Sequence, residues 1–150
     1  MPSLIGPAQE GFMRNKWIGH AAFDIITVQE TLSKQRKAAA LLFLDQQKAY
    51  DRVSHSYLKA VLAKFALPLT LRTAISAMYN QNTAQILGPQ GPLPPILIQT
   101  GVRQGDPLSP LLFNLTIEPL AQHLQNKLQG ISLLNSTFVF GFTLMTLHLD

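Results

Sequence analysis

The run of residues from Ala38 to Val53, AAALLFLDQQKAYDRV, limits the possible folds of this chain more than any other feature. Seven apolar residues lead directly into the carboxylate of Asp45, and a second acid, Asp51, follows six positions later. Good helix formers favour a helix here, whereas an uninterrupted apolar run also suits a central strand that is covered on both faces. In a strand, Asp45 would lie at the carboxyl end and face a solvent-filled cleft. Acids also end strands and cap the next helix, so a purely structural Asp45 is the alternative.

The composition is that of a globular chain. With 150 residues, 47% of them hydrophobic and 13% charged, the chain can bury a core and is not polar enough to be disordered. No apolar run reaches the ~20 residues of a membrane-spanning helix, and the N-terminus lacks the pattern of a secretion signal. Because there is no cysteine, disulfides and thiolate metal sites are excluded. We expect an intracellular protein, in the cytoplasm or the nucleus, with no membrane partner.

Positive charge is concentrated in the first half of the chain. The formal net charge is +4, and ten of the twelve Lys and Arg residues lie at or before Arg72. A basic surface suits a polyanion such as a nucleic acid, although it also occurs in proteins without such a partner. The residues expected to form a solvated basic face that touches phosphates are Arg14, Lys16, Lys34, Arg36 and Lys37.

Apolar periodicity and capping residues predict helices along most of the chain. The first runs from about His20 to Lys34. A second begins after the capping residue Ser54 and stops before Pro68, and Thr70 is expected to cap a third.

A hairpin and a fourth helix follow. Residues 84–100, AQILGPQGPLPPILIQT, are two β-prone runs around a Gly/Pro cluster, which predicts a hairpin with a long turn. The loop GVRQGDPLSP then leads into a helix that has Ser109 as N-cap, contains a kinking Pro119 and ends at Gly130. Short extended runs are expected at 131–133 and 137–142, so the fold class is α+β.

Three motifs in this order resemble the reverse transcriptase domain of LINE-type (non-LTR) retrotransposons. FLDQQKAYDRVSHSYL is similar to the first catalytic motif of that family, an Asp followed by Lys-Ala-aromatic-Asp. GVRQGDPLSPLLFNLTIEPL matches the Gln-Gly motif almost throughout, and QEGFMRNKWI resembles the upstream Gln-x-Gly-Phe segment, with Asn15-Lys16 where the family usually has Gly-Arg. The resemblance covers residues 4 to 133.

The resemblance implies part of a right-hand polymerase, with a small, mostly antiparallel sheet packed on helices. Residues 1–37 would belong to the fingers side and 38–53 to a palm strand. Helices and a hairpin would occupy 54–103, and the Gln-Gly loop with a palm helix 104–133. In the complete family enzyme, deoxynucleotides are added to a DNA primer on an RNA template. Two Mg²⁺ ions, held by carboxylates and other hard oxygen ligands, neutralise charge in the phosphoryl transfer.

The resemblance also assigns roles to single residues. Asp45 falls at the position of the catalytic, metal-binding Asp, and the backbone carbonyl of Gln46 would be a second ligand. Tyr50 falls at the steric-gate position, where a ring beneath the sugar leaves no room for a 2′ hydroxyl; its alternative is a half-buried core aromatic. Gln104 and Gly105 would line the incoming nucleotide and the template base, and Arg103 would meet a phosphate.

Other polar residues near the motifs are expected to have structural roles. Lys48 and Asp51 match the family but are interpreted as local ion-pair or turn residues. The isolated histidines, expected to be structural or surface groups, are His20, His55 and His123.

One departure limits the predicted activity. The third motif of the family is an aromatic-x-Asp-Asp turn, and the chain contains no Asp-Asp pair. Asp150 lies about where the first Asp of that turn should come, so it is a candidate for a second catalytic and metal-binding carboxylate. Alternatively, residues 134–150 are unrelated to the motif. We therefore expect a truncated polymerase fragment that is inactive alone, or else a basic, non-catalytic nucleic-acid-binding remnant.

Overall fold

The computed structural model describes residues 4–7, 9–17, 19–38, 40, 42–128, 131–133 and 136–138. The chain divides into two compact units. One unit is Lys48–Thr116, and the other combines Met1–Gln47 with Ile117–Asp150.

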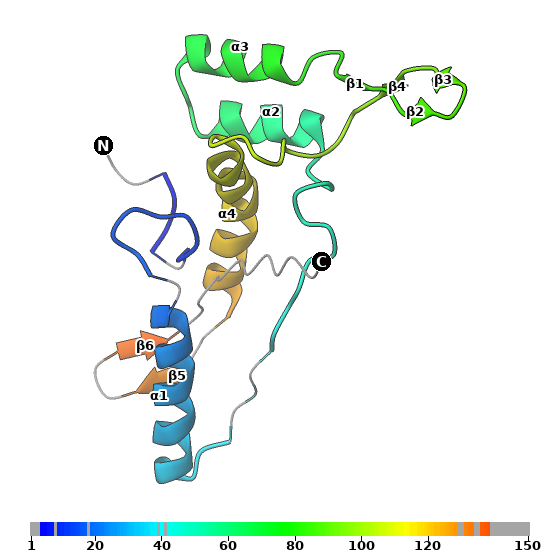
Figure 1. Cartoon of the computed structure of the whole chain (residues 1–150). Helices are drawn as coiled ribbons and strands as arrows, with labels where there is room; N and C mark the ends of the chain where they lie inside the picture. The colour runs from blue at the N-terminus through cyan, green and yellow to red at the C-terminus, as the bar shows by residue number, and fades with distance from the viewer. Residues whose placement is uncertain are drawn as a thin grey trace. The chain divides into compact units, whose positions relative to one another are not determined.

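Two short helices that lie side by side form the body of the unit Lys48–Thr116 (Figure 1). Helix α2 spans His55–Lys64, and Ser54 caps it as predicted, its Oγ accepting a hydrogen bond from the Tyr57 N–H at 3.4 Å. Helix α3 spans Leu69–Met78 and begins directly after Pro68 with no side-chain cap. The expected cap at Thr70 is therefore wrong, because the fixed φ of Pro68 already starts the helix one residue before Thr70.

The core of this unit joins the helix pair to the residues before and after it. Leu58 and Leu62 on α2 are each 1% exposed, and Ile75 on α3 is 2% exposed. The first turns of α4, a helix that spans Ser109–Lys127, add the buried side chains of Leu112 and Phe113. Leu58 and Leu62 are four positions apart, so they lie on the same face of α2 and are buried together.

A hairpin leaves the helix pair and returns to it, as predicted. Its outer ladder pairs β1 (Thr83–Ala84) with β4 (Ile96–Leu97), and its inner ladder pairs β2 (Leu87–Gly88) with β3 (Gly91–Pro92), both antiparallel. The turn is shorter than predicted, since only Pro89 and Gln90 separate the inner strands. Gly91 has φ of +117°, a value that glycine adopts without steric cost.

The chain after the hairpin pairs with the chain before α2. The N–H of Val102 donates to the carbonyl of Tyr50 at 2.9 Å, and the N–H of Gly101 donates to the carbonyl of Val53 at 2.8 Å. The N–H of His55 donates in the opposite direction, to the carbonyl of Gln99 at 3.2 Å. We call this antiparallel pairing of residues 50–55 with 99–102 the closing ladder, because it brings together both ends of the helix–hairpin segment.

The loop after the closing ladder leads into α4. The carboxylate of Asp106 accepts a hydrogen bond from the Leu108 N–H at 2.9 Å, a turn typical of Asp ahead of a helix. Ser109, the predicted N-cap, is instead the first residue of α4, and its buried Oγ has no hydrogen-bond partner among the described residues. Pro119 lies inside α4 as predicted, whereas Gly130 lies outside the described residues.

The second unit contains helix α1, which spans Gly19–Gln35 and confirms the helix predicted from His20 to Lys34. In the part of α4 that belongs to this unit, the buried carboxylate of Glu118 accepts the N–H of Gly6 and the side-chain amide of Gln122, both at 2.9 Å. Strand β5 (Ile131–Leu133) pairs with β6 (Ser136–Phe138) antiparallel, so the first expected run is confirmed and the second begins one residue earlier.

The strand expected over residues 38–53 is not formed in the described part of that range. Residues 42–46 adopt no regular structure, and turns follow from Gln47 to Arg52. The side chains of Leu42, Phe43 and Leu44 are 75%, 74% and 71% exposed. A strand needs a neighbouring strand to satisfy its backbone groups, and the described residues provide none for this run. Helices with small antiparallel sheets still confirm the α+β class, although the strands of the described residues form three separate two-stranded sheets instead of one.

Replacing Leu58 by alanine should destabilise the helix pair. Because Leu58 is 1% exposed, the truncation leaves a cavity, and we expect the free energy of unfolding to fall by about 2–5 kcal/mol. Urea unfolding followed by circular dichroism measures this change. Leu69→Ala is the matched control, since Leu69 is 68% exposed and its loss should cost within about 0.5 kcal/mol. Equal losses in the two variants would contradict this core.

Candidate functional site

Tyr50, the predicted steric gate, is held at the start of the closing ladder. Its carbonyl accepts the N–H of Val102 at 2.9 Å. Its half-buried ring lies against Phe113 of α4, with centroids 4.8 Å apart and planes at 60°. Burial raises the pKa of the Tyr50 phenol above its ordinary value of 10.0. The core residue Phe113 therefore supports the Tyr50 ring, and the closing ladder fixes the Tyr50 backbone.

The Gln-Gly loop, which we define as residues Gly101–Gly105, continues directly from the closing ladder. Gly101 and Gly105 have φ of +97° and +82°, in the left-handed region that glycine tolerates. A Cβ atom on Gly101 would lie 3.3 Å from the Cα of Asp51, whereas one on Gly105 would meet nothing within 4 Å. The first glycine therefore permits close packing against the first motif, and the second leaves open space beside the loop.

Polar side chains of the loop bind to fixed partners in the same unit. The Gln104 side-chain amide donates to the carboxylate of Asp51 at 3.4 Å. The Arg103 guanidinium donates to the Asn82 side chain at 3.1 Å and to the Met78 carbonyl at 3.2 Å. Asp51 thus contacts the loop itself, whereas the sequence interpretation gave it only a local turn or ion-pair role.

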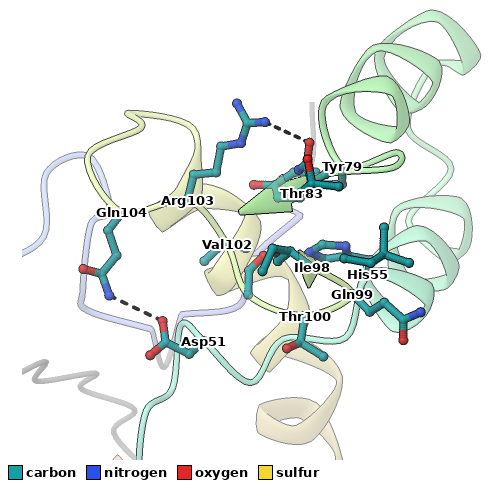
Figure 2. A pocket seen from close by; sticks show the side chains of 13 residues that line it. Asp51, His55, Tyr79, Thr83, Ile98, Gln99, Thr100, Val102, Arg103 and Gln104 are labelled. Carbon is teal, nitrogen blue, oxygen red and sulfur yellow. Dashed lines mark hydrogen bonds between the residues drawn. The ribbon is translucent and has the colours of Figure 1, made fainter. Parts of the chain in front are cut away.

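A cavity of about 540 Å³ opens between the loop, the base of the hairpin and the start of α2. Figure 2 shows Arg103 and Gln104 on one side of it, with His55 and Thr100 on the other. His55 is buried, and its Nε2 lies 2.9 Å from the carbonyl oxygen of Gly101. Tyr79, whose ring centroid is 4.9 Å from that of His55, has a buried hydroxyl without a hydrogen-bond partner among the described residues. Polar groups from three separate segments therefore converge here.

The predicted site residues are divided between the two compact units. Tyr50, Arg103, Gln104 and Gly105 all belong to the unit Lys48–Thr116. Asp45 and Gln46 belong to the other unit, where both are exposed at the end of the irregular run. Asp150 lies outside the described residues.

The described residues do not by themselves complete a metal site. Among residues 4–128, apart from the undescribed positions within that range, and the strands β5 and β6, no three His, Cys, Asp or Glu side chains lie close enough to share an ion. The Asp45 carboxylate and the Gln46 carbonyl have the hard oxygen chemistry that Mg²⁺ prefers. These two donors could fill two of its six octahedral positions, and the others would be left to water, substrate phosphates and further carboxylates.

The predicted basic residues all lie in the unit that contains α1. Lys16 pairs with Glu10 at 3.2 Å and also donates to the Pro7 carbonyl. Lys34 lies 3.9 Å from Glu30 across one turn of α1. The remaining three, which are exposed and form no ion pair within the described part of the chain, are Arg14, Arg36 and Lys37.

The sequence of residues 1–142 matches the family model for reverse transcriptase (RNA-dependent DNA polymerase). The chain belongs to the reverse transcriptase family. Its members act on nucleic-acid templates with nucleotide substrates and use divalent metal ions.

Curated relatives identify the retrotransposon type of this reverse transcriptase domain. A retrovirus-related Pol polyprotein from the type-1 retrotransposable element R2 of Popillia japonica is 34% identical over 121 residues, which are 80% of this chain and 17% of that protein. The transposon TX1 uncharacterized 149 kDa protein of Xenopus laevis is 33% identical over 119 residues, 77% of this chain and 9% of that protein.

A more distant relative agrees with this assignment. The Pol polyprotein from the type-2 retrotransposable element R2DM of Drosophila melanogaster is 27% identical over 122 residues, 81% of this chain and 12% of that protein. The non-LTR family predicted from the motifs is therefore confirmed. The chain spans less than a fifth of the length of these relatives. No helix in the described part of the reverse transcriptase domain has the length and apolarity to cross a membrane.

Sequence reasoning overlooked the contacts that hold the loop. His55 was interpreted as a structural or surface group, and its bond to Gly101 joins residues 46 positions apart in the chain. Asn82 and Tyr79 could not be selected from the sequence, because neither belongs to one of the three motifs. A glycine directly after a β-prone run was the available hint, because such glycines often mark a close approach of two backbones.

The reverse transcriptase domain should tolerate alanine at Gly105 better than at Gly101. Both positions have positive φ, a strain of about 1–3 kcal/mol for a residue with a side chain. Only the Cβ at 101 would also press on Asp51, at 3.3 Å from its Cα. Urea unfolding of Gly101→Ala should therefore show the larger loss of stability, with Gly105→Ala as the control. Indistinguishable losses would contradict the close approach at Gly101.

Ionisation of Tyr50 should lower stability at alkaline pH. Because burial raises its pKa above 10.0 in the folded chain, the folded state binds more protons than the unfolded state above that pH. The free energy of unfolding should then fall as the pH rises beyond about 10. Spectrophotometric titration should show a component from Tyr50 that ionises above the ordinary range, and Tyr50→Phe should remove that component. A titration curve that keeps the component in Tyr50→Phe would assign it elsewhere.

Proposed function

We propose that this chain forms the nucleotide-pocket part of an RNA-directed DNA polymerase, with an RNA template, a DNA primer and deoxynucleoside triphosphates as its partners. The observation that carries the proposal is the closing ladder. It joins the second half of the first motif, Tyr50–His55, to the residues that lead into Gln104 and Gly105. Two motifs about fifty residues apart in the chain thereby contribute to one surface.

Tyr50 would select deoxynucleotides in this pocket. Selection by a clash with the 2′ hydroxyl needs a ring that cannot move aside, since an adaptable side chain would simply yield. The contact of the Tyr50 ring with Phe113, which is 2% exposed, supplies that rigidity. Support from the core is what the steric-gate role of Tyr50 requires.

The Gln-Gly loop would recognise the nucleotide and its template base. Gly105 has open space where a side chain would project, so a ligand can approach its backbone. The Gln104 amide is exposed and has both a donor and an acceptor. Arg103 is exposed as well, and because its present partners are neutral, its charge is available for a phosphate.

Asp45 and the Gln46 carbonyl would hold the divalent ion, which we propose to be Mg²⁺. When bound, the ion supplies charge neutralisation at the phosphoryl group. The exposed carboxylate of Asp45 meets the requirement for a hard oxygen ligand. Since the chain contains no Asp-Asp pair, we infer that residues 1–150 alone lack a sufficient ligand set and do not extend a primer. Asp150 is the chain's own candidate for a further carboxylate.

A non-catalytic nucleic-acid-binding role is the second candidate. It is favoured by the exposed side chains of Arg14, Arg36 and Lys37, which form no ion pair within the described residues. Contacts of this kind would bind phosphates without regard to sequence and weaken steeply with salt.

Primer extension on an RNA template with Mg²⁺ tests the polymerase role. Residues 1–150 alone should give no extension. A fusion that adds the polypeptide following the matched segment in the Popillia japonica relative should restore it. In that fusion, Asp45→Asn should lower extension by about a hundredfold or more, as for other groups that stabilise transition-state charge. Asp24→Asn is the control, because Asp24 is an exposed acid on α1.

Each other outcome points to a specific error. Extension by residues 1–150 that Asp45→Asn abolishes would show that this chain supplies its own second carboxylate, and would overturn the inactivity inferred here. Extension that survives Asp45→Asn would remove Asp45 from the metal site. A fusion that binds primer–template in a salt-sensitive way but never extends it would favour the non-catalytic role.

A further inference from the structure

We propose that His55 is a positioning residue of the polymerase pocket, which holds the Gln-Gly loop in place through the carbonyl of Gly101. The inference deepens the proposed function and rests on it for the role of the loop. The contact itself lies wholly within the unit Lys48–Thr116. His55 would touch neither nucleotide nor metal and would act through the loop backbone.

The imidazole of His55 is the donor in this contact. Its Nε2 lies 2.9 Å from the Gly101 carbonyl oxygen. A carbonyl oxygen can only accept, so the ring nitrogen must carry the hydrogen. The neutral ring is therefore required to be the Nε2–H tautomer, with Nδ1 unprotonated. A histidine that merely filled space in the core would have no such requirement.

Two further contacts fix the position of the ring. The His55 side chain is 7% exposed, and its centroid lies 4.9 Å from that of Tyr79, which is 4% exposed. The backbone N–H of His55 donates to the Gln99 carbonyl at 3.2 Å. Main chain and side chain of one residue thus bind two carbonyls of the returning segment, on either side of Thr100.

Gly101 is the point at which the returning segment turns into the loop. Its N–H donates to Val53 at 2.8 Å, which leaves its carbonyl for His55. Its φ of +97° directs the chain toward Arg103 and Gln104. Within the described residues, His55 is the only group found to donate to this carbonyl. Removing that donor should let the peptide unit after Gly101 reorient and the loop with it.

Three substitutions distinguish the packing of the His55 ring against Tyr79 from its hydrogen bond to the Gly101 carbonyl. His55→Phe keeps an aromatic ring against Tyr79 but has no donor. His55→Gln places an amide nitrogen at a reach similar to that of Nε2, and His55→Asn has a shorter amide that should not reach the carbonyl. If the role is positional, Gln should rescue the loop where Phe and Asn do not. If the role is only packing, Phe should be the best replacement.

Hydrogen exchange of the 150-residue chain tests this directly. We expect the amides of Gly101 and Val102 to exchange about tenfold faster in His55→Phe and His55→Asn, the effect of one lost hydrogen bond. In His55→Gln they should stay near the wild-type rate. Interior amides of α2 and α3 should be unchanged in all three, which separates loop release from general unfolding. Wild-type exchange at Gly101 and Val102 in His55→Phe would overturn the proposal.

A second measurement needs no variant. Long-range nitrogen–proton correlations of the His55 ring should show the Nε2–H tautomer in the neutral imidazole of the wild-type chain. The Nδ1–H tautomer would overturn the proposal even if every variant failed to fold. Neither readout depends on polymerase activity, so a failed extension assay and a failed positioning role give separate results.

Discussion

The closing ladder is the constraint on which the rest of this unit depends. Three backbone hydrogen bonds join residues 50–55 to residues 99–102. The chain between these two segments must therefore begin and end at neighbouring, paired strands. The entropic cost of closing so long a loop rises only slowly with the length of the loop. Most of the residues between the two sides of the ladder are folded into helices α2 and α3 and into the hairpin. These local structures reduce the length of flexible chain that must be closed, so the ladder can form at a modest entropic cost.

The same ladder divides the chemistry of the first motif. Tyr50 is held by the ladder and by Phe113 of the core. Asp45, five residues earlier, lies on an irregular, exposed run that belongs to the other compact unit. Tyr50, the proposed nucleotide-selecting residue, therefore has rigid, buried supports, whereas the described residues of its own unit give Asp45, the proposed metal ligand, none. In the terms of catalysis, the proposed binding group is preorganised within its unit and the proposed charge-neutralising group is not.

Local signals predicted most of the secondary structure. The apolar spacing of α1 and α2, the cap at Ser54 and the Gly/Pro punctuation of the hairpin each depend on a few neighbouring residues. The strand predicted within residues 38–53 was wrong for its described residues, because strand formation depends on non-local contacts. An apolar run indicates that its side chains should be buried, but it does not indicate which segment buries them or which strand pairs with it.

The candidate site residues divide in the same way. Tyr50, Gln104 and Gly105 could be named because each sits in a motif that resembles a known family. The His55–Gly101 bond and the Arg103–Asn82 bond could not, since they are contacts between segments distant in sequence. Asp51 shows the limit most clearly. Its sequence neighbours suggest a turn, while its carboxylate accepts from Gln104 in the other motif.

The hairpin has a consequence for how copies of this chain behave toward one another. From Thr83 to Thr100 there is no charged side chain, and Leu87 at its tip is 83% exposed. Uncharged, apolar strands with free edges are templates for edge-to-edge aggregation. The segment from Thr83 to Thr100 is interrupted by four prolines, Pro89, Pro92, Pro94 and Pro95. A proline cannot donate to a further strand, so the segment carries gatekeeper residues in place of the charges that most proteins use.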